Sequence, residues 1–130
     1  MRVGRAPVLA IAACAAALAV NTVHAAEKIT FTPKGLEKYP AKPATCEIAV
    51  FQDTAKPDRP HAEIGVLNYH DERHRTDTSA LTLAVALPKM KAAACKAGGD
   101  ALMEIRVTEA KHLEWALFNV RAVVVRYGAR

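Results

Sequence analysis

The stretch from Leu83 to Val107 constrains the fold more than any other part of the chain, because a helix, a stop and a strand follow one another in it directly. Its apolar residues recur at steps of three and four, the spacing of one helical face. This face consists of Leu83, Leu87, Met90, Ala94 and Ala97. Gly98 and Gly99 follow, where glycine allows a helix to close in the left-handed conformation. Pro88 suits only a first helical turn, so the regular helix begins near Leu87 or is bent upstream of it.

Alternation of apolar and polar residues predicts the strands. A period of two runs from Ala101 to Val107 and recurs in three other segments, which are Cys46–Gln52, Glu63–Tyr69 and Ala116–Tyr127. Between them we expect an exposed hydrophilic loop at His70–Ser79 and a turn at Thr108–Glu114. Gly65 interrupts a predicted strand and indicates a bulge or a close backbone approach.

The predicted order of elements is therefore strand, strand, helix, strand, strand. This order favours an α+β fold in which one amphipathic helix packs on one face of a small, mostly antiparallel sheet. A chain of 130 residues has room for one such domain with a modest core.

The N-terminal residues 1–25 are typical of a bacterial signal peptide. Arg2 and Arg5 precede an apolar run from Pro7 to Val20, and Val23-His24-Ala25 places small residues where signal peptidase cleaves. The run is too short for a good membrane span. These features predict a periplasmic or secreted protein.

A second kind of processing competes with this prediction. Ile11-Ala12-Ala13-Cys14 resembles a lipobox, in which Cys14 would be lipidated and become the first residue of an outer-membrane-anchored protein. Only a very short apolar core precedes it, so we expect ordinary cleavage after Ala25.

The rest of the chain divides into a linker and one domain. Residues 26–45 contain Pro33, Gly35, Pro40 and Pro43 with four lysines, which predicts an extended linker. Residues 46–130 form the domain. Its two cysteines, Cys46 and Cys95, are expected to form a disulfide in an oxidising compartment, although a buried thiol pair or a reactive thiol are alternatives.

Two segments of the domain resemble known families. Glu63–Asn68 together with Leu87–Ile105 resembles the small α/β module of the Rcs-type outer-membrane sensor lipoproteins, and is similar to the pentamer-forming "heavy-metal-binding" domains of bacterial proteins. In those families a strand containing Leu/Ile-Gly-Glu/Val precedes a helix that ends in A-x-x-x-G-A-[DN]-A-[VL] and a further strand. The matching residues here are Ala94, Gly98, Asp100, Ala101 and Leu102.

The resemblance implies the fold of this module and no particular activity. The Rcs-type sensors have four cysteines in two disulfides, and Cys46 and Cys95 do not fall on those positions, so sensor function is not carried over. Metal binding is not carried over either, because the matching residues include no ligand set.

His70 and His74 are the best metal-ligand candidates. Two histidines four residues apart share a face if their segment is helical, and imidazoles with neighbouring carboxylates suit zinc or copper. No helix is predicted there, and Arg73 and Arg75 would repel a cation. A hydrophilic loop is therefore the simpler interpretation.

Other chemistry finds less support. Ser79 is the only serine in the chain and no nucleophile-elbow pattern surrounds it, while Cys95 lies at the helix end that disfavours a thiolate. The formal net charge of +5 comes from scattered basic residues without interleaved aromatics, so nucleic acid is not an expected partner. Trp115 could form an exposed patch or close the core, and we favour the core.

These observations predict a non-enzymatic envelope protein without a cofactor, which acts as a binding or interaction module. Its partner would be an unknown envelope protein or a second copy of the chain through exposed strand edges. Contact with a membrane would occur only through a lipid on Cys14. The alternative is a periplasmic protein that binds a small ligand or metal through the segment from His70 to His74.

Overall fold

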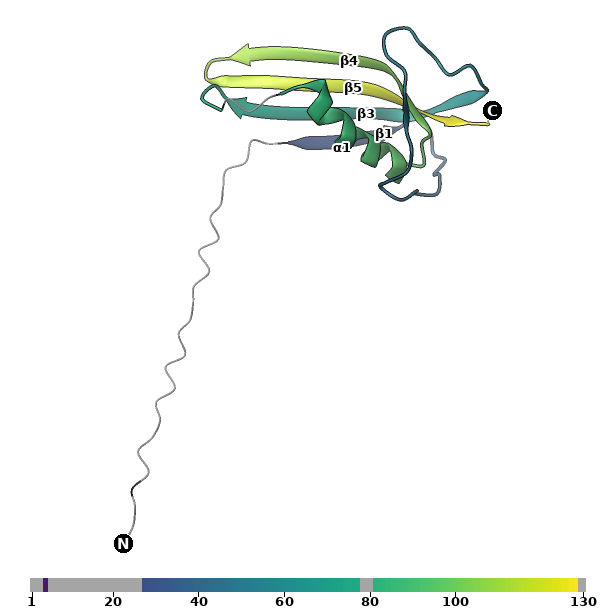
Figure 1. Cartoon of the computed structure of the whole chain (residues 1–130), viewed down its shortest axis with the longest axis horizontal. Helices are drawn as coiled ribbons and strands as arrows, with labels where there is room; N and C mark the ends of the chain where they lie inside the picture. The colour runs from purple at the N-terminus through teal and green to yellow at the C-terminus, as the bar shows by residue number, and fades with distance from the viewer. Residues whose placement is uncertain (1–3, 5–26, 78–80, 129–130) are drawn as a thin grey trace.

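The structure is a computed structural model that describes residue 4 and residues 27–77 and 81–128. Apart from residue 4, the predicted signal peptide lies outside these described residues. Cys14 and Ser79 lie outside them as well. The elements are β1 (Lys28–Pro33), β2 (Ala49–Val50), β3 (His61–His74), α1 (Leu83–Lys96), β4 (Ala101–His112) and β5 (Trp115–Tyr127) (Figure 1).

The predicted α+β class is confirmed, because one helix lies across one face of a small sheet (Figure 1). The five strands have the spatial order β1-β3-β5-β4-β2. The details differ from the prediction. A strand, β1, precedes the expected series, and the sheet is mixed because β2 runs parallel to β4.

The prediction of a linker at residues 26–45 is wrong for its first part. β1 pairs antiparallel with β3 from Lys28 to Pro33. The side chains of Ile29 and Phe31 lie on the face of the sheet that α1 covers, and they pack against the core. Gly65 of β3 makes room for this strand, since a Cβ atom there would lie 2.5 Å from the Phe31 ring. Both expectations for Gly65 are met, because the register between β3 and β5 also shifts there.

The second part of the predicted linker is held against the end of α1. The Lys42 backbone N–H donates to the Cys95 carbonyl at 2.9 Å, and its ammonium group contacts Asp100 and the Gly99 carbonyl. Tyr39 packs against Gly98, where a Cβ atom would lie 2.7 Å from that of Tyr39. The segment therefore belongs to the fold.

The helix begins earlier than Leu87 and ends where predicted. It starts at Leu83 with Thr82 as N-cap and contains Pro88 in its interior. Gly98 has φ of +83°, and its N–H donates to the Cys95 carbonyl at 3.0 Å. The Gly99 N–H donates to the Ala94 carbonyl at 2.9 Å, which completes a Schellman motif.

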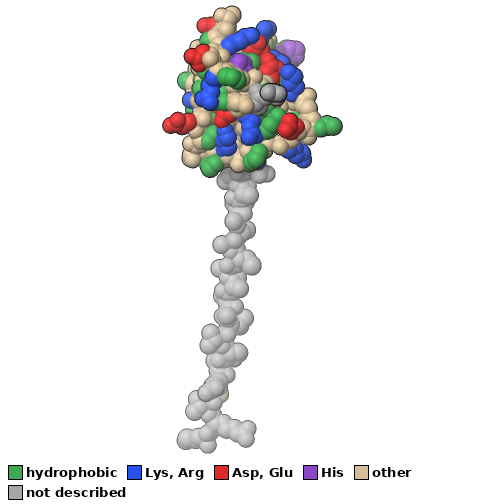
Figure 2. Space-filling view, turned by 90° about the vertical axis from the view of Figure 1, so that its right-hand side faces the viewer, with side chains coloured by type: hydrophobic (Ala, Val, Ile, Leu, Met, Phe, Trp, Pro, Cys, Tyr) green, Lys and Arg blue, Asp and Glu red, His purple; other side chains and the backbone are tan. Residues whose placement is uncertain are grey.

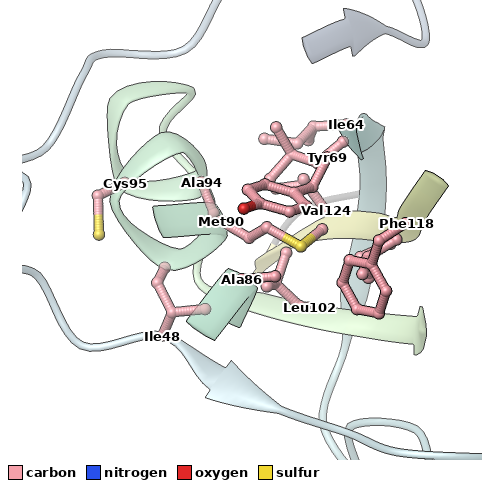
Figure 3. Close-up of a cluster of buried hydrophobic side chains, with 13 residues drawn as sticks. Ile48, Ile64, Tyr69, Ala86, Met90, Ala94, Cys95, Leu102, Phe118 and Val124 are labelled. Atoms are coloured by element: carbon pink, nitrogen blue, oxygen red, sulfur yellow. The ribbon is translucent and has the colours of Figure 1, made fainter. Parts of the chain in front are cut away.

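The main core lies between α1 and the sheet. Met90 points from the helix toward Tyr69 and Leu102 of the sheet (Figure 3). The predicted disulfide is confirmed, and it joins Cys46, before β2, to the buried Cys95 of α1. Such a closure of a long loop contributes on the order of 2–4 kcal/mol to a small domain.

A smaller apolar cluster lies on the opposite face of the sheet. It is formed by Ala101, Met103, Val123 and Val125 with Phe51 and Tyr127. On the end of the molecule seen in Figure 2, basic and acidic side chains are interspersed. Among the described residues, no helix is long and apolar enough to span a bilayer.

Candidate interaction surface

The outer side of β4 is an open strand edge along most of its length. β2 pairs with β4 only at Ala101 and Leu102, and from Arg106 to His112 the strand pairs with β5 alone among the described residues. We call the segment Arg106–His112 the free β4 edge. The other sheet edge, β1, is shorter, ends at a proline and lies beside α1 (Figure 1).

A bulge separates the paired part of β4 from the free β4 edge. Glu104 has φ of +51°, and the β4–β5 register shifts between Met103 and Arg106. Opposite it, the chain leaves β2 through Asp53, which has φ of +56°. A left-handed conformation is uncommon for glutamate and more readily adopted by aspartate, and a bulge of this kind bends the strand locally. A cavity of about 360 Å³ opens between them, lined by Asp53, Thr54, Lys56, Glu104, Ile105 and Arg106.

The register identifies the backbone groups that the free β4 edge presents. A two-residue turn joins His112 to Trp115, which makes this terminal pair a hydrogen-bonded one. Because such pairs alternate in an antiparallel ladder, the N–H and C=O groups of Val107, Glu109 and Lys111 point outward. They form a regular row of donors and acceptors.

The side chains of the free β4 edge are exposed, and most of them are polar or charged. Val107 is 45% exposed, and Glu109 and Lys111 follow on the same face of the strand. Charged residues on an edge discourage indiscriminate pairing with other strands. The edge is therefore suited to a partner segment with complementary charges.

The turn that ends this edge exposes two apolar side chains. We call Leu113, Glu114 and Trp115 the hairpin tip. Leu113 is 78% exposed and has φ of +52°, a conformation for which hairpins ordinarily use glycine or asparagine. Trp115 is 41% exposed, so the expectation that it belongs to the core is wrong.

The predicted loop at His70–Ser79 is wrong as far as His74, because β3 continues to that residue. His74 lies at the hairpin tip, with its ring edge-on to Trp115 at a centroid distance of 5.5 Å. Its Nδ1 is 2.8 Å from Thr76 Oγ1 and its Nε2 is 3.2 Å from Glu114 Oε2. These contacts fix the ring beside the tryptophan.

The two histidines do not converge on one ligand position. Four residues along an extended strand separate His70 and His74 by about 13 Å. His70 instead has its Nδ1 2.6 Å from Asn119 Oδ1. In the part of the chain that the structure describes, no three His, Cys, Asp or Glu side chains are placed to hold a metal ion.

A polar network, buried at Tyr69 and Asp71 and exposed at Glu27 and Lys89, links the start of β1 to α1 and β3. The Tyr69 hydroxyl lies 3.1 Å from Glu27 Oε2 and 3.2 Å from Asp71 Oδ2, and Lys89 of α1 approaches Glu27 within 2.5 Å. Burial and the Asp71 charge raise the pKa of Tyr69. The hydrogen bond from Lys89 lowers the pKa of Glu27.

Asp71 is the least satisfied group of this network. It is 1% exposed, Arg73 pairs with its Oδ2 at 3.1 Å, and its Oδ1 has no hydrogen-bond partner among the described residues. The network fixes the point where the chain enters the sheet.

Sequence reasoning missed the free β4 edge because it ended the strand at Val107. The apolar alternation stops at Val107, because Glu109 and Lys111 follow on its face and residues 106–112 are all exposed, so no local pattern marks the continuation of the strand. The exposed Leu113 carried no signal either, because a bulky residue in a left-handed turn is not expected from its type.

Comparisons with known proteins bear on the fold alone. No protein-family model matches the chain, and no curated protein sequence matches it. The fold is similar to that in the crystal structure of a Francisella virulence factor, FvfA, in its orthorhombic form, with a TM-score of 0.50 and 14% sequence identity. The match covers 75% of this chain and 97% of that one.

Proposed function

We propose that this chain is an exported, non-enzymatic binding module of the bacterial envelope, which recognises an extended segment of a partner protein by strand addition at the free β4 edge. The observation that carries the proposal is the row of outward N–H and C=O groups at Val107, Glu109 and Lys111. A partner strand would extend the line of β2 and add its own ladder to the sheet.

Two features of the surface support recognition of a single extended segment. The cavity beside Glu104 and Arg106 lies where β2 leaves the sheet, so a side chain of an added strand has a place to enter. Glu109 and Lys111, which lie on one face of the strand, favour a segment with complementary charges. Backbone pairing would supply affinity, and these side chains would supply specificity.

Export is supported by the N-terminal sequence and is consistent with the disulfide. Residues 1–25 have the pattern of a signal peptide, and the Cys46–Cys95 disulfide is compatible with an oxidising compartment.

Strand addition is tested by removing one outward N–H from the edge. Glu109→Pro eliminates that donor and leaves the β4–β5 hydrogen bonds in place, because the Glu109 N–H points outward. A photo-crosslinking residue at Val107, in the producing bacterium, is expected to give a discrete adduct. The adduct is expected to disappear in Glu109→Pro.

Glu109→Ala is the matched control, because it removes the same side chain and keeps the N–H. It is expected to retain the adduct. Equal crosslinking in both variants would show that the backbone of the free β4 edge is not recognised, and the proposal would then fail. A crosslinking residue at Thr32, on the opposite sheet edge, is expected to give no such adduct.

A further inference from the structure

The hairpin tip and the N-terminal entry of the chain lie at the same end of the sheet. Lys28, the first residue of β1, pairs with His70, and four residues further along β3 His74 pairs with Trp115. In Figure 1 the start of β1 and the β4–β5 turn are both opposite the C-terminus. The chain before Glu27, which includes the predicted leader and Cys14, therefore enters the fold beside the hairpin tip.

We propose that the hairpin tip inserts into the surface of a lipid bilayer, with Leu113 and Trp115 at the boundary between headgroups and acyl chains. This inference rests on the proposed export of the chain, which brings it to a membrane-bounded compartment. A lipid on Cys14 would leave twelve residues before Glu27, a reach of at most about 45 Å. With that lipid the tip would lie within this distance of the bilayer, and after cleavage at Ala25 the tip alone would make the contact.

The two apolar side chains of the tip are held in exposed positions before any partner binds. Leu113 occupies a left-handed position that glycine would fill without strain, and it is exposed there instead of packing on the sheet. Trp115 is held by the ring of His74, which Thr76 and Glu114 orient in turn. Tryptophan has an apolar body and a polar N–H, and this combination is enriched at bilayer interfaces.

The charges around the tip favour apolar insertion over attraction to anionic lipid. Arg75 and Lys111 are exposed beside it, but so are Asp77 and Glu114. The local charge is close to balanced. Binding is therefore expected to depend weakly on salt and on the proportion of anionic lipid.

Trp115 is the only tryptophan of the chain, so its fluorescence reports directly on this contact. The processed protein from the producing cells is mixed with vesicles of phosphatidylethanolamine that contain a minority of phosphatidylglycerol. Its emission is expected to shift to shorter wavelength and to be quenched by lipids with brominated acyl chains. An unchanged emission at saturating lipid would overturn the proposal.

Leu113→Gly separates membrane contact from folding. The substitution removes the apolar side chain and relieves the left-handed strain, so the fold is expected to be at least as stable. The partition coefficient is expected to fall roughly tenfold. Equal vesicle binding by Leu113→Gly would exclude the tip as the contact.

Leu36→Ser is the matched control, because Leu36 is fully exposed but follows β1 at the opposite end of the sheet. It is expected to bind vesicles as the unaltered protein does. An equal loss in Leu36→Ser would indicate unspecific adsorption, and binding abolished by high salt would indicate charge recognition; either result contradicts insertion. Glu109→Pro is expected to keep vesicle binding. A failure of membrane insertion can therefore be distinguished from a failure of strand addition.

Discussion

Asp100 shows how a residue of the family-like motif can serve structure alone. Its Oδ2 accepts a hydrogen bond from the Tyr127 N–H at 2.8 Å, and its Oδ1 contacts the Lys42 ammonium group. Burial opposes ionisation of this carboxyl group, but Lys42 and the Tyr127 N–H outweigh it and lower the pKa of Asp100. Asp100 thereby joins the segment around Lys42 to the end of β5.

Asp100→Asn is expected to destabilise the fold at neutral pH by about 1–2 kcal/mol, because hydrogen bonds to a charged group are lost. A carboxyl group with a lowered folded-state pKa stabilises the fold above its unfolded pKa of about 3.9, and this contribution disappears as the pH falls through the folded-state pKa. The difference from the unaltered protein should therefore shrink in acid. Urea unfolding between neutral and acidic pH measures it.

Asp58→Asn, in the exposed loop after β2, is the control for the loss of a negative charge. It is expected to leave the free energy of unfolding nearly unchanged at each pH. A constant difference between Asp100→Asn and the unaltered protein across the pH range would contradict the assigned ion pair.

At the scale of elements, the sequence predicted what is encoded locally. The ends of β5 and the stop of α1 follow from alternation and from Gly98. β1 was missed because only Ile29 and Phe31 alternate in it between prolines and lysines, and its pairing depends on distant β3. The outer part of β3 was missed because its residues are polar, and Asp71 becomes buried beside Tyr69 and Arg73 only when the segment is a strand of the sheet.

For the candidate interaction surface too, local features could be predicted from the sequence and long-range features could not. The free β4 edge depends on where β2 stops, a long-range property that depends on Glu104 and Asp53. The disulfide was predictable because composition left only Cys46 and Cys95 to pair in the domain. The separation of His70 from His74 became evident only once their segment was a strand.

The contact between β1 and β3 is tested by Gly65→Ala. The added Cβ would lie 2.5 Å from both the Phe31 ring and the Thr32 carbonyl oxygen, and the backbone oxygen cannot move aside without breaking the strand pair. We expect a loss of roughly 2–3 kcal/mol in the free energy of unfolding. Chemical denaturation measures it.

Gly35→Ala is the matched control, because no atom lies within 4 Å of the position of its added Cβ. It is expected to change stability by no more than about 0.5 kcal/mol. Similar values for the two variants would mean that β1 does not lie against Gly65.

At the scale of the whole molecule, the two ends of the sheet have different contents. One end holds the hairpin tip and the entry of the chain, and the other holds the C-terminal end of β5 and the segments after β1 and β2 (Figure 1). Glu27 is fixed by Tyr69 and Lys89 directly before β1 begins. Little chain therefore separates the predicted cleavage site from the fold.

Processing of the N-terminus is tested by mass spectrometry of the protein from the producing cells. Cleavage by signal peptidase is expected to give a chain that starts at Ala26. A chain that starts at a lipid-modified Cys14 would establish the lipoprotein alternative. An uncleaved chain that starts at Met1 would contradict export through a cleaved leader.

The strand order has a consequence for the time that folding takes. Apart from the β4–β5 hairpin, each strand pairs with one that is distant in sequence, and β2 has to find β4 across the whole of β3 and α1. Topologies of this kind fold in milliseconds to seconds, because segments distant in sequence have to meet before the contacts between them can stabilise the fold. Among the strand pairs of the described residues, the β4–β5 hairpin alone is local, so the segment that carries the tip is expected to form early, before the edge strands pair.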